Sequence, residues 1–320
     1  GMCYKFLIET PKGKLLYKAD PYAIYSQRRP ETASVIWDLK YEWQDQQWME
    51  RRRRKDHFKE PLNIYEVHLG SWRRPHAVRT DGDNSACPEF YTYRELADML
   101  IPYVKDMGYT HLEILPVMEH PFDASWGYQT TGLFSATSRY GNPQDLMYFI
   151  DRCHRSNLGV ILDWVPGHFC RDAHGLSTFN GRKLYGEREH PNWGTFKFDY
   201  GRGQVRSFLL SSAMFWLEQF HADGIRVDGV SSMLFMNFGI EDEKKKRFNK
   251  DGTDSDPNAI AFLQEFSRTI GRYFPEVYTF AEESTAWPLV TYPPDLGGLG
   301  FHYKWNMGWM NDTLGFMQTD

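Results

Sequence analysis

Three apolar, strand-like segments of the chain each end in an acidic residue: Asp163, Asp228 and Glu282. A carboxylate after an apolar run is costly to bury unless it is paired or functional. For any single one, a strand-end acid that caps a neighbouring helix is an equally good explanation. Three acids at the same end of successive strands instead favour one shared site, because active sites of α/β proteins lie at the carboxyl ends of parallel strands.

Arg226 and Asp228 are two residues apart, so in a strand their side chains project from the same face. An arginine within a few ångströms would keep Asp228 ionised, because an opposite charge lowers the pKa of a carboxyl group. Glu282 follows an apolar strand, and apolar surroundings raise a carboxyl pKa. One ionised and one protonated carboxyl on adjacent strands is the arrangement of a glycosidase pair. A purely structural Arg226–Asp228 ion pair is the alternative.

Two further segments carry side chains suited to binding a sugar. His168 closes the run that begins at Asp163 and would donate a hydrogen bond to a sugar hydroxyl. A loop histidine that faces water fits the same pattern. The segment Trp126-Gly127-Tyr128-Gln129 offers flat rings in a glycine-containing loop, and aromatic faces fit the apolar faces of sugars, although a packed surface cluster would look the same in sequence.

The elements that must position these residues alternate between short apolar runs and amphipathic stretches from residue 61 onward. This alternation indicates parallel strands joined by right-handed helical crossovers. Doubly wound sheets and (β/α)8 barrels share the pattern, but no glycine-rich phosphate loop follows the first strand, which argues against a nucleotide-binding sheet. We expect strands at 62–69, 111–117, 159–165, 224–230, 277–281 and, more weakly, 301–306, and helices at 93–107, 143–157, 204–220 and 258–274.

Ahead of this region, residues 1–26 predict a short hairpin and residues 27–60 a polar connector rich in aromatic residues. Two strands bury too little surface to be stable alone, so the hairpin either ends a β-rich module or packs against the larger domain. The basic run at residues 51–55 predicts a solvated face of the connector rather than a nucleic-acid site. The chain opens in strand-like and closes in helix-like sequence, so we expect neither end to be a natural terminus.

Composition excludes several classes of protein. The 320 residues carry a net charge of −5, a mean hydropathy of −0.59 and 16% aromatic residues. An acidic chain lacks the basic surface that nucleic-acid binding needs, no apolar run is long enough for a membrane span, and so many aromatics are untypical of disorder. No secretory signal is visible at the start. Four widely spaced cysteines indicate reduced thiols in the cytoplasm rather than a metal site: Cys3, Cys87, Cys153 and Cys170.

Taken together, the motifs resemble glycoside hydrolase family 13, the α-amylase family, and within it the glycogen (1,4-α-glucan) branching enzymes. The resemblance covers nearly the whole chain. Its motifs are Asp163-Trp-Val-Pro-Gly-His168-Phe, Gly224-Ile-Arg226-Val-Asp228, Ala281-Glu282-Glu283-Ser284-Thr285, Tyr65-Glu-Val-His-Leu-Gly-Ser-Trp72, Trp126-Gly-Tyr-Gln, the run from Gly300 to Met310, and Tyr41-x-Trp43-x-Asp45-x-x-Trp48.

The resemblance implies an α/β fold: an incomplete (β/α)8 TIM-type barrel in residues 61–320, with about six of eight strands, preceded by the tail of an N-terminal carbohydrate-binding β-sandwich in residues 1–26. It implies a retaining enzyme that cleaves an α-1,4-glucan and transfers the chain to a 6-hydroxyl, with Asp228 as nucleophile and Glu282 as general acid and base. Glycogen or amylose would be the partner, and no metal, cofactor, nucleic acid or membrane is expected. Arg226 would support the nucleophile, and Tyr128, Asp163 and His168 would line the donor-sugar subsite.

Two departures from the family pattern limit this interpretation. The family supplies a third carboxylate from a His-Asp-Glu motif after the seventh strand, and no His-Asp pair follows residue 302 here. The loop after the fourth strand carries a charged stretch at residues 241–256 where branching enzymes usually have a Pro-Asn and Gly-Gly segment. We therefore expect the chain alone to have little or no activity. An amylolytic or debranching hydrolase of the same family and a non-catalytic glucan-binding protein remain alternatives.

Overall fold

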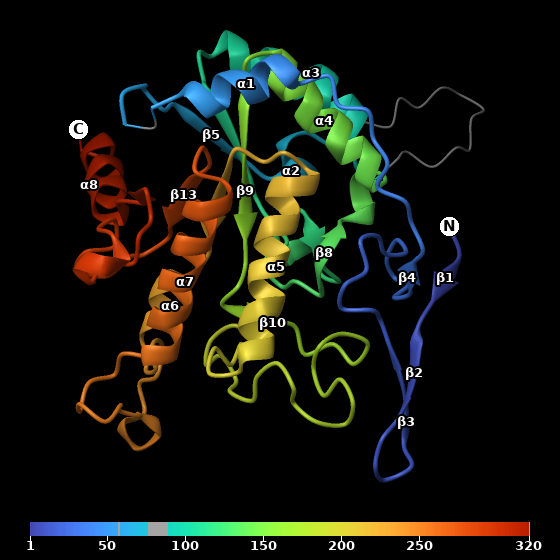
Figure 1. The fold of residues 1–320 in the computed structure, drawn as a ribbon, viewed down its shortest axis with the longest axis vertical. Helices are drawn as coiled ribbons and strands as arrows, with labels where there is room; N and C mark the ends of the chain where they lie inside the picture. Colours follow the sequence, from blue (N-terminus) through green and yellow to red (C-terminus); the bar gives the residue numbers. More distant parts are fainter. Residues whose placement is uncertain (57, 76–88, 320) are drawn as a thin grey trace.

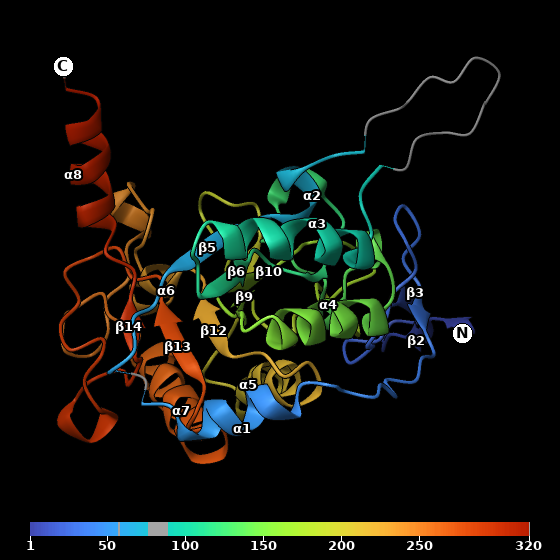
Figure 2. The same ribbon diagram turned by 90° about the horizontal axis from the view of Figure 1, so that it is seen from above.

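A curled parallel sheet forms the centre of the computed structural model, which describes residues 1–56, 58–75 and 89–319. Within these residues the sheet has six strands in the order β14-β13-β12-β9-β6-β5. The spatial order follows the chain order, as in a barrel wall, rather than reversing midway as in a doubly wound sheet. The predicted incomplete barrel is confirmed (Figures 1 and 2). Its strands are β5 (Ile64–Val67), β6 (His111–Ile114), β9 (Gly159–Trp164), β12 (Gly224–Val227), β13 (Tyr278–Ala281) and β14 (Tyr303–Lys304).

Helices cover the outer side of the curled sheet (Figure 2). The larger ones begin where the sequence offers an N-cap. Thr92 and Glu95 form a reciprocal capping box, Asn142 and Asp145 form another, and Asp256 accepts from two backbone amides at the start of its helix. Such caps satisfy amides that the helix leaves unpaired. The helices are α1 (Gln46–Arg54), α2 (Leu69–Trp72), α3 (Tyr93–Asp106), α4 (Pro143–Arg155), α5 (Gly203–Gln219), α6 (Val230–Leu234), α7 (Pro257–Tyr273) and α8 (Met307–Met317).

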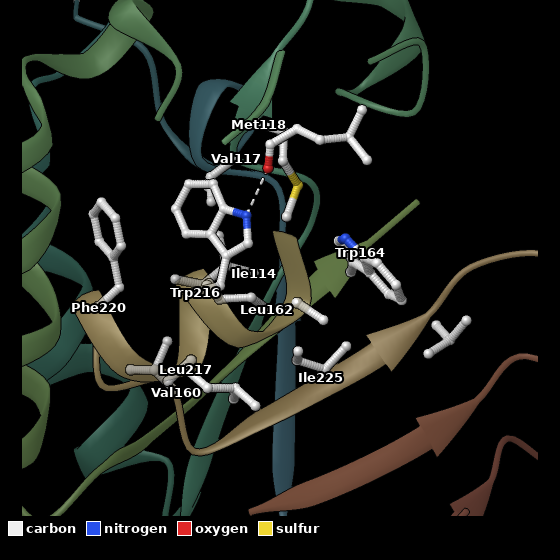
Figure 3. Packing of buried hydrophobic residues seen from close by; sticks show 14 of the residues in the cluster. Ile114, Val117, Met118, Val160, Leu162, Trp164, Trp216, Leu217, Phe220 and Ile225 are labelled. Carbon is white, nitrogen blue, oxygen red and sulfur yellow. Dashed lines mark hydrogen bonds between the residues drawn. The ribbon is translucent and has the colours of Figure 1, made fainter. Parts of the chain in front are cut away.

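The main hydrophobic core lies between the sheet and the large helices α3, α4, α5 and α7. Trp216 of α5 is fully buried, and its indole nitrogen donates to the Leu133 carbonyl at 2.9 Å. Figure 3 shows this ring among apolar side chains from the sheet and from α5 itself. Alternate strand residues therefore face the helices, which leaves the residues between them to face the barrel interior. The core residues labelled around Trp216 include Ile114, Met118, Val160, Leu162 and Ile225.

The first 35 residues form two small antiparallel pairs apart from the main sheet. The hairpin predicted in residues 1–26 is present as β2 (Phe6–Glu9) and β3 (Leu15–Lys18). Strand β1 (Cys3–Tyr4) pairs instead with β4 (Ser34–Val35), so backbone hydrogen bonds link the hairpin segment to the connector. Loops of the barrel contribute the remaining short strands, β7 (Met118–Glu119), β8 (Gly132–Ala136), β10 (His168–Phe169) and β11 (Phe196–Lys197).

The basic run in the connector corrects one prediction. Residues 51–54 lie in α1, and Arg52 is only 5% exposed. Its Nη1 lies 3.0 Å from Oδ1 of Asp223 and also donates to the carbonyls of His221 and Ala222. The expectation of a solvated face is wrong for Arg52, because a buried acid on the barrel is its partner. The other three arginines of this helix are exposed.

A buried polar network anchors the same connector to the amino-terminal end of the barrel. Nδ1 of His154 lies 2.8 Å from Asp45, and its Nε2 lies 2.8 Å from Asp223. Since both ring nitrogens face carboxylate oxygens, both must donate, and the ring is an imidazolium. The indole of Trp48 also donates to Asp223. Asp45 and Trp48 of the connector motif therefore have a structural role, at the end of the barrel opposite the acidic strand ends.

Two simpler expectations concern cysteines and membrane spans. Cys3 is exposed, Cys153 and Cys170 are buried, and all three are free thiols, whereas Cys87 lies outside the described residues. In the part of the chain that the structure describes, no helix combines the length and apolar character needed to cross a membrane.

Candidate active site

The carboxyl ends of β9, β12 and β13 bring four predicted residues together. Arg226 on β12 lies in register with Asp163 on β9. The backbone ladder continues past the strands, since the amide of Asp228 donates to the Trp164 carbonyl and the amide of Glu282 donates to the Val227 carbonyl, both at 3.0 Å. The predicted convergence of these side chains at one end of the sheet is confirmed.

Arg226 contacts three carboxylates through one guanidinium group. Its Nη1 donates to both oxygens of Asp163 at 2.8 and 2.7 Å and to Oδ1 of Asp228 at 3.1 Å. Its Nη2 lies 3.1 Å from Oε2 of Glu282. Because the planar fork has fixed donor directions, it fixes the Asp228 and Glu282 carboxyl groups relative to each other.

The carboxyl groups of Asp228 and Glu282 have pKa shifts in opposite directions. Burial acts to raise the pKa of Asp228, but the adjacent His168 ring and the charge of Arg226 together hold it below its ordinary value. Burial and the neighbouring charge of Asp228 raise the pKa of Glu282. The Gly229 amide donates to Oε2 of Glu282 at 2.7 Å. At neutral pH the pair therefore consists of an ionised aspartate beside a glutamate that holds its proton more tightly than usual.

Asp163 and Tyr128 lie next to this pair and are linked to each other. The Tyr128 hydroxyl donates to Oδ2 of Asp163 at 2.7 Å. Burial raises the pKa of Asp163 to about 7, although Arg226 opposes that shift. The loop that carries Tyr128 passes so close to Pro116 that a Cβ at Gly127 would lie 2.3 Å from the Pro116 carbonyl. Glycine at this position lets the loop present Tyr128 to the site.

His168 is buried at 3% exposure, so the alternative of a water-facing loop histidine is wrong. Its Nε2 lies 3.7 Å from Oδ2 of Asp228, and within the described residues its Nδ1 has no hydrogen-bond partner. The ring lies 4.9 Å from that of Trp193, which stacks on His190 with centroids 3.6 Å apart. His190 and Trp193 were not predicted, because they lie in a long loop that has no periodic pattern.

Glu113 is a second residue that sequence reasoning missed. Its side chain is 1% exposed on β6, and Oε1 lies 4.0 Å from Nε of Arg226. Burial, reinforced by the charge of Asp163, raises the pKa of Glu113 to about 9. A charged residue in the middle of the apolar run at 111–115 is the signal that would have found it.

The assembled groups suit displacement at a carbon atom. Asp228 can attack as a carboxylate, Glu282 can give and take a proton, and Arg226 balances the charge of both. Among the residues that the structure describes, no group of three or more His, Cys, Asp or Glu side chains is placed to hold a metal ion.

Comparisons with known proteins agree with this geometry. A family model described as the catalytic domain of alpha amylase matches residues 97–193. The whole chain is 53% identical to a protein of Bacillus caldolyticus and 52% identical to one of Desulfitobacterium hafniense, each named 1,4-alpha-glucan branching enzyme GlgB. The matches cover 46% and 49% of those proteins, so the chain spans about half the length of the curated relatives it matches.

A solved structure extends the comparison to the fold alone. A crystal structure from Salmonella typhimurium, described provisionally as an alpha amylase, superposes with a TM-score of 0.65 at 23% identity. The match covers 89% of this chain and 41% of that chain. The curled sheet and its helices are therefore an arrangement already seen in a longer protein.

Proposed function

Since the chain belongs to the α-amylase family, we propose that it is the central part of a 1,4-α-glucan branching enzyme. The observation that carries the proposal is the contact of one guanidinium, that of Arg226, with both Asp228 and Glu282 at 3.1 Å. The identity of 53% and 52%, over the whole of this chain, to proteins named as branching enzymes favours branching over other reactions of the family.

In the first step, Glu282 donates its proton to the glycosidic oxygen of an α-1,4-glucan. The Asp228 carboxylate attacks the anomeric carbon from the opposite face, and the bond from that carbon to the glycosidic oxygen breaks. The reducing-end fragment leaves as a neutral alcohol. The non-reducing fragment stays bound to Asp228 through an ester, and Glu282 is now ionised.

In the second step, ionised Glu282 takes the proton of a glucan 6-hydroxyl. The resulting oxygen attacks the anomeric carbon, the ester to Asp228 breaks, and an α-1,6 branch forms with retained configuration. If water takes the place of the 6-hydroxyl, the same steps give hydrolysis. The choice between the two products therefore depends on which hydroxyl reaches the ester first.

The donor sugar would be held by the predicted binding residues. Asp163 accepts from sugar hydroxyls, His168 donates through Nε2, the ring nitrogen that faces Asp228, and the Tyr128 ring provides an apolar face beside Arg226. The exposed ring of Trp126, at the edge of the same loop, would extend this surface toward the next sugar.

The same proposal includes a domain division and a location. Residues 1–26 would end a carbohydrate-binding β-sandwich, residues 27–60 would connect it, and residues 61–320 would form most of the barrel. The separation of the β2–β3 hairpin from the main sheet supports this division. We place the enzyme in the cytoplasm, where free thiols persist, with glycogen or amylose as its partner.

An amylose assay tests the proposal. Residues 1–320 are expressed alone and also joined to the C-terminal part of the Bacillus caldolyticus relative, which we expect to close the sheet. The joined protein should lower the iodine absorbance of amylose without releasing reducing ends. Release of reducing ends would indicate a hydrolase, and glucan binding with no change in either readout would indicate a non-catalytic binding protein.

A further inference from the structure

A cavity of about 1500 Å³ lies beside the candidate active site. One wall is the loop that carries residues 187–202, and the other is the charged segment at residues 241–256 that departs from the family pattern. Both segments lie at the lower end of the molecule in Figure 1, toward which the strand β9 points. The mechanism above makes no use of this cavity.

The lining of the cavity has an excess of positive charge. It contains eight lysine and arginine residues against five acidic residues. Four of those acids are already engaged. Glu187 and Asp199 pair with Arg202 at 3.0 and 2.8 Å, Glu189 pairs with an arginine outside the cavity, and Asp256 caps α7.

Several cations of the lining have no acidic partner. Lys197 is largely buried, donates to the Ser232 carbonyl, and has no ion pair within the described residues. Burial lowers the pKa of Lys197 to about 8; the charge of Asp256 opposes this shift and the charge of Arg188 adds to it. An anion in the cavity would act on Lys197 in the same direction as Asp256 and offset the charge of Arg188. In the described part of the chain, four more side chains of the lining form no ion pair: Arg188, Lys244, Arg247 and Lys250.

The cavity adjoins the residues of the candidate active site. Lys197 on β11 lies in register with His168 on β10, which contacts Asp228. Its Nζ donates to Ser232, which lies on α6, the helix that begins two residues after Asp228. A glucan chain that leaves the site on this side would pass over the cavity.

We propose that the cavity binds phosphate monoester groups carried by the α-glucan substrate. The inference rests on the proposed function. It narrows the substrate to glucans that carry phosphate, because a neutral glucan would not need a positively charged cavity. A phosphate dianion pairs well with several lysine and arginine side chains, which form short charge-assisted hydrogen bonds to its oxygens. Free inorganic phosphate has the same chemistry, so the experiment separates the two sources.

Calorimetry on residues 1–320 compares three probes: inorganic phosphate, maltoheptaose, and maltoheptaose with one 6-phosphate group. We expect the phosphorylated sugar to bind about tenfold more tightly than the plain sugar, since hydrogen bonds between charged groups are stronger than neutral ones. The difference in affinity between the two sugars should shrink at high salt, because salt screens the exposed lysines and arginines of the charged segment at residues 241–256. Equal affinity for the two sugars, or inorganic phosphate bound more tightly than the phosphorylated sugar, would overturn the inference.

A matched pair of triple variants locates the site. Replacing Arg188, Arg247 and Lys250 by glutamine should remove the tenfold preference and leave the affinity for maltoheptaose unchanged. The control replaces the exposed Arg51, Arg53 and Arg54 of α1 by glutamine, which alters the net charge equally, and should keep the preference. An equal loss in both variants would contradict a local site. If inorganic phosphate binds through the first triplet and neither sugar binds, both the inference and the proposed function are wrong, whereas maltoheptaose binding without any preference for the phosphorylated sugar would overturn the inference alone.

Discussion

Nη1 of Arg226 lies 3.1 Å from Oδ1 of Asp228, two residues farther along the chain. The strand geometry puts both side chains on one face, and the second nitrogen of the same guanidinium reaches Glu282. This contact favours the ionised form of Asp228, while the charge of Asp228 favours the protonated form of Glu282. Two carboxyl groups of similar intrinsic acidity thereby have pKa values shifted in opposite directions, as the proposed retaining mechanism needs.

A bell-shaped dependence of kcat/KM on pH follows from this pair. Activity requires Asp228 ionised, so it is present above the pKa of Asp228, which is lowered. It also requires Glu282 protonated, so it is lost as the pH rises through the raised pKa of Glu282. The acid limb should lie at a pH below the ordinary range of carboxyl pKa values, and the alkaline limb should lie at a pH above it. Rates of the joined protein on amylose at a series of pH values check this, and an alkaline limb at an ordinary glutamate pKa would contradict it.

Arg226→Lys should lower kcat/KM by about a hundredfold, because a lysine cannot hold two carboxylates in fixed directions. The acid limb of the pH profile should also move upward, since Asp228 loses part of its stabilising charge. The control is Arg94→Lys, at an exposed ion pair with Asp145 on the outer helices. A variant with reduced activity but an unmoved acid limb would assign Arg226 a structural role only.

The buried network of Asp45, His154 and Asp223 at the amino-terminal end of the barrel should stabilise the fold. Asp45→Asn should lower the free energy of unfolding by about 3 kcal/mol, because it leaves a buried imidazolium with one partner fewer. The exposed Asp38→Asn is the control. Urea unfolding midpoints of both variants and of the parent chain measure the effect, and a change equal to that of the control would refute the network's role.

The same network predicts how stability depends on pH. Burial acts to raise the pKa of Asp45, but hydrogen bonds from His154 and His221 hold that pKa below its ordinary value. The stability from Asp45 is therefore present above the ordinary aspartate pKa and is lost as the pH falls through the lowered value. Burial acts to lower the pKa of His154, but the charges of Asp223 and Asp45 and the hydrogen bonds to them together raise it. The contribution of His154 is therefore full below the ordinary histidine pKa and is lost as the pH rises through the raised value. Asp45→Asn should flatten the acid side of this curve.

Residues 1–320 alone should self-associate. Strands β5 and β14 each have one hydrogen-bonded neighbour in the described sheet, and an open strand edge favours pairing with another chain. The helix α8 has no buried residue, and its Trp309 and Phe316 are 68% and 78% exposed. Sedimentation velocity over a range of concentrations should detect the association. Replacing both residues by serine should weaken it, whereas Phe6→Ser on the distant hairpin should not.

Much of the fold and the centre of the site could be predicted from short-range patterns. The alternation of apolar runs and amphipathic stretches gave the six strands and the four large helices within a few residues of their bounds. Parallel strands share one carboxyl end, so acids at their ends had to meet. The two-residue spacing of Arg226 and Asp228 predicted their contact, because a strand repeats every two residues.

The parts that could not be predicted depend on long-range contacts. Arg52 is one of four consecutive arginines, and nothing local shows which one meets Asp223, 171 positions away. Trp193 and His190 stack beside His168 from a loop without periodicity. The charge of Glu113 inside an apolar strand marks it as unusual in the sequence, but its partner Arg226 is known only from the fold. In each case the tertiary partner, rather than the local pattern, decides where the side chain lies.

The central claim, that Asp228 forms a covalent bond to the sugar, can be tested by trapping that ester. The Glu282→Gln variant is mixed with α-maltosyl fluoride, whose leaving group needs no proton, so the first step proceeds and the second is slow. Peptide mass spectrometry is applied to residues 1–320 joined to the C-terminal part of the Bacillus caldolyticus relative. We predict one maltosyl group on the peptide that contains Asp228 and none when Asp228→Asn is added. A maltosyl group on Asp163 or another residue, or no covalent product at all, would contradict the account.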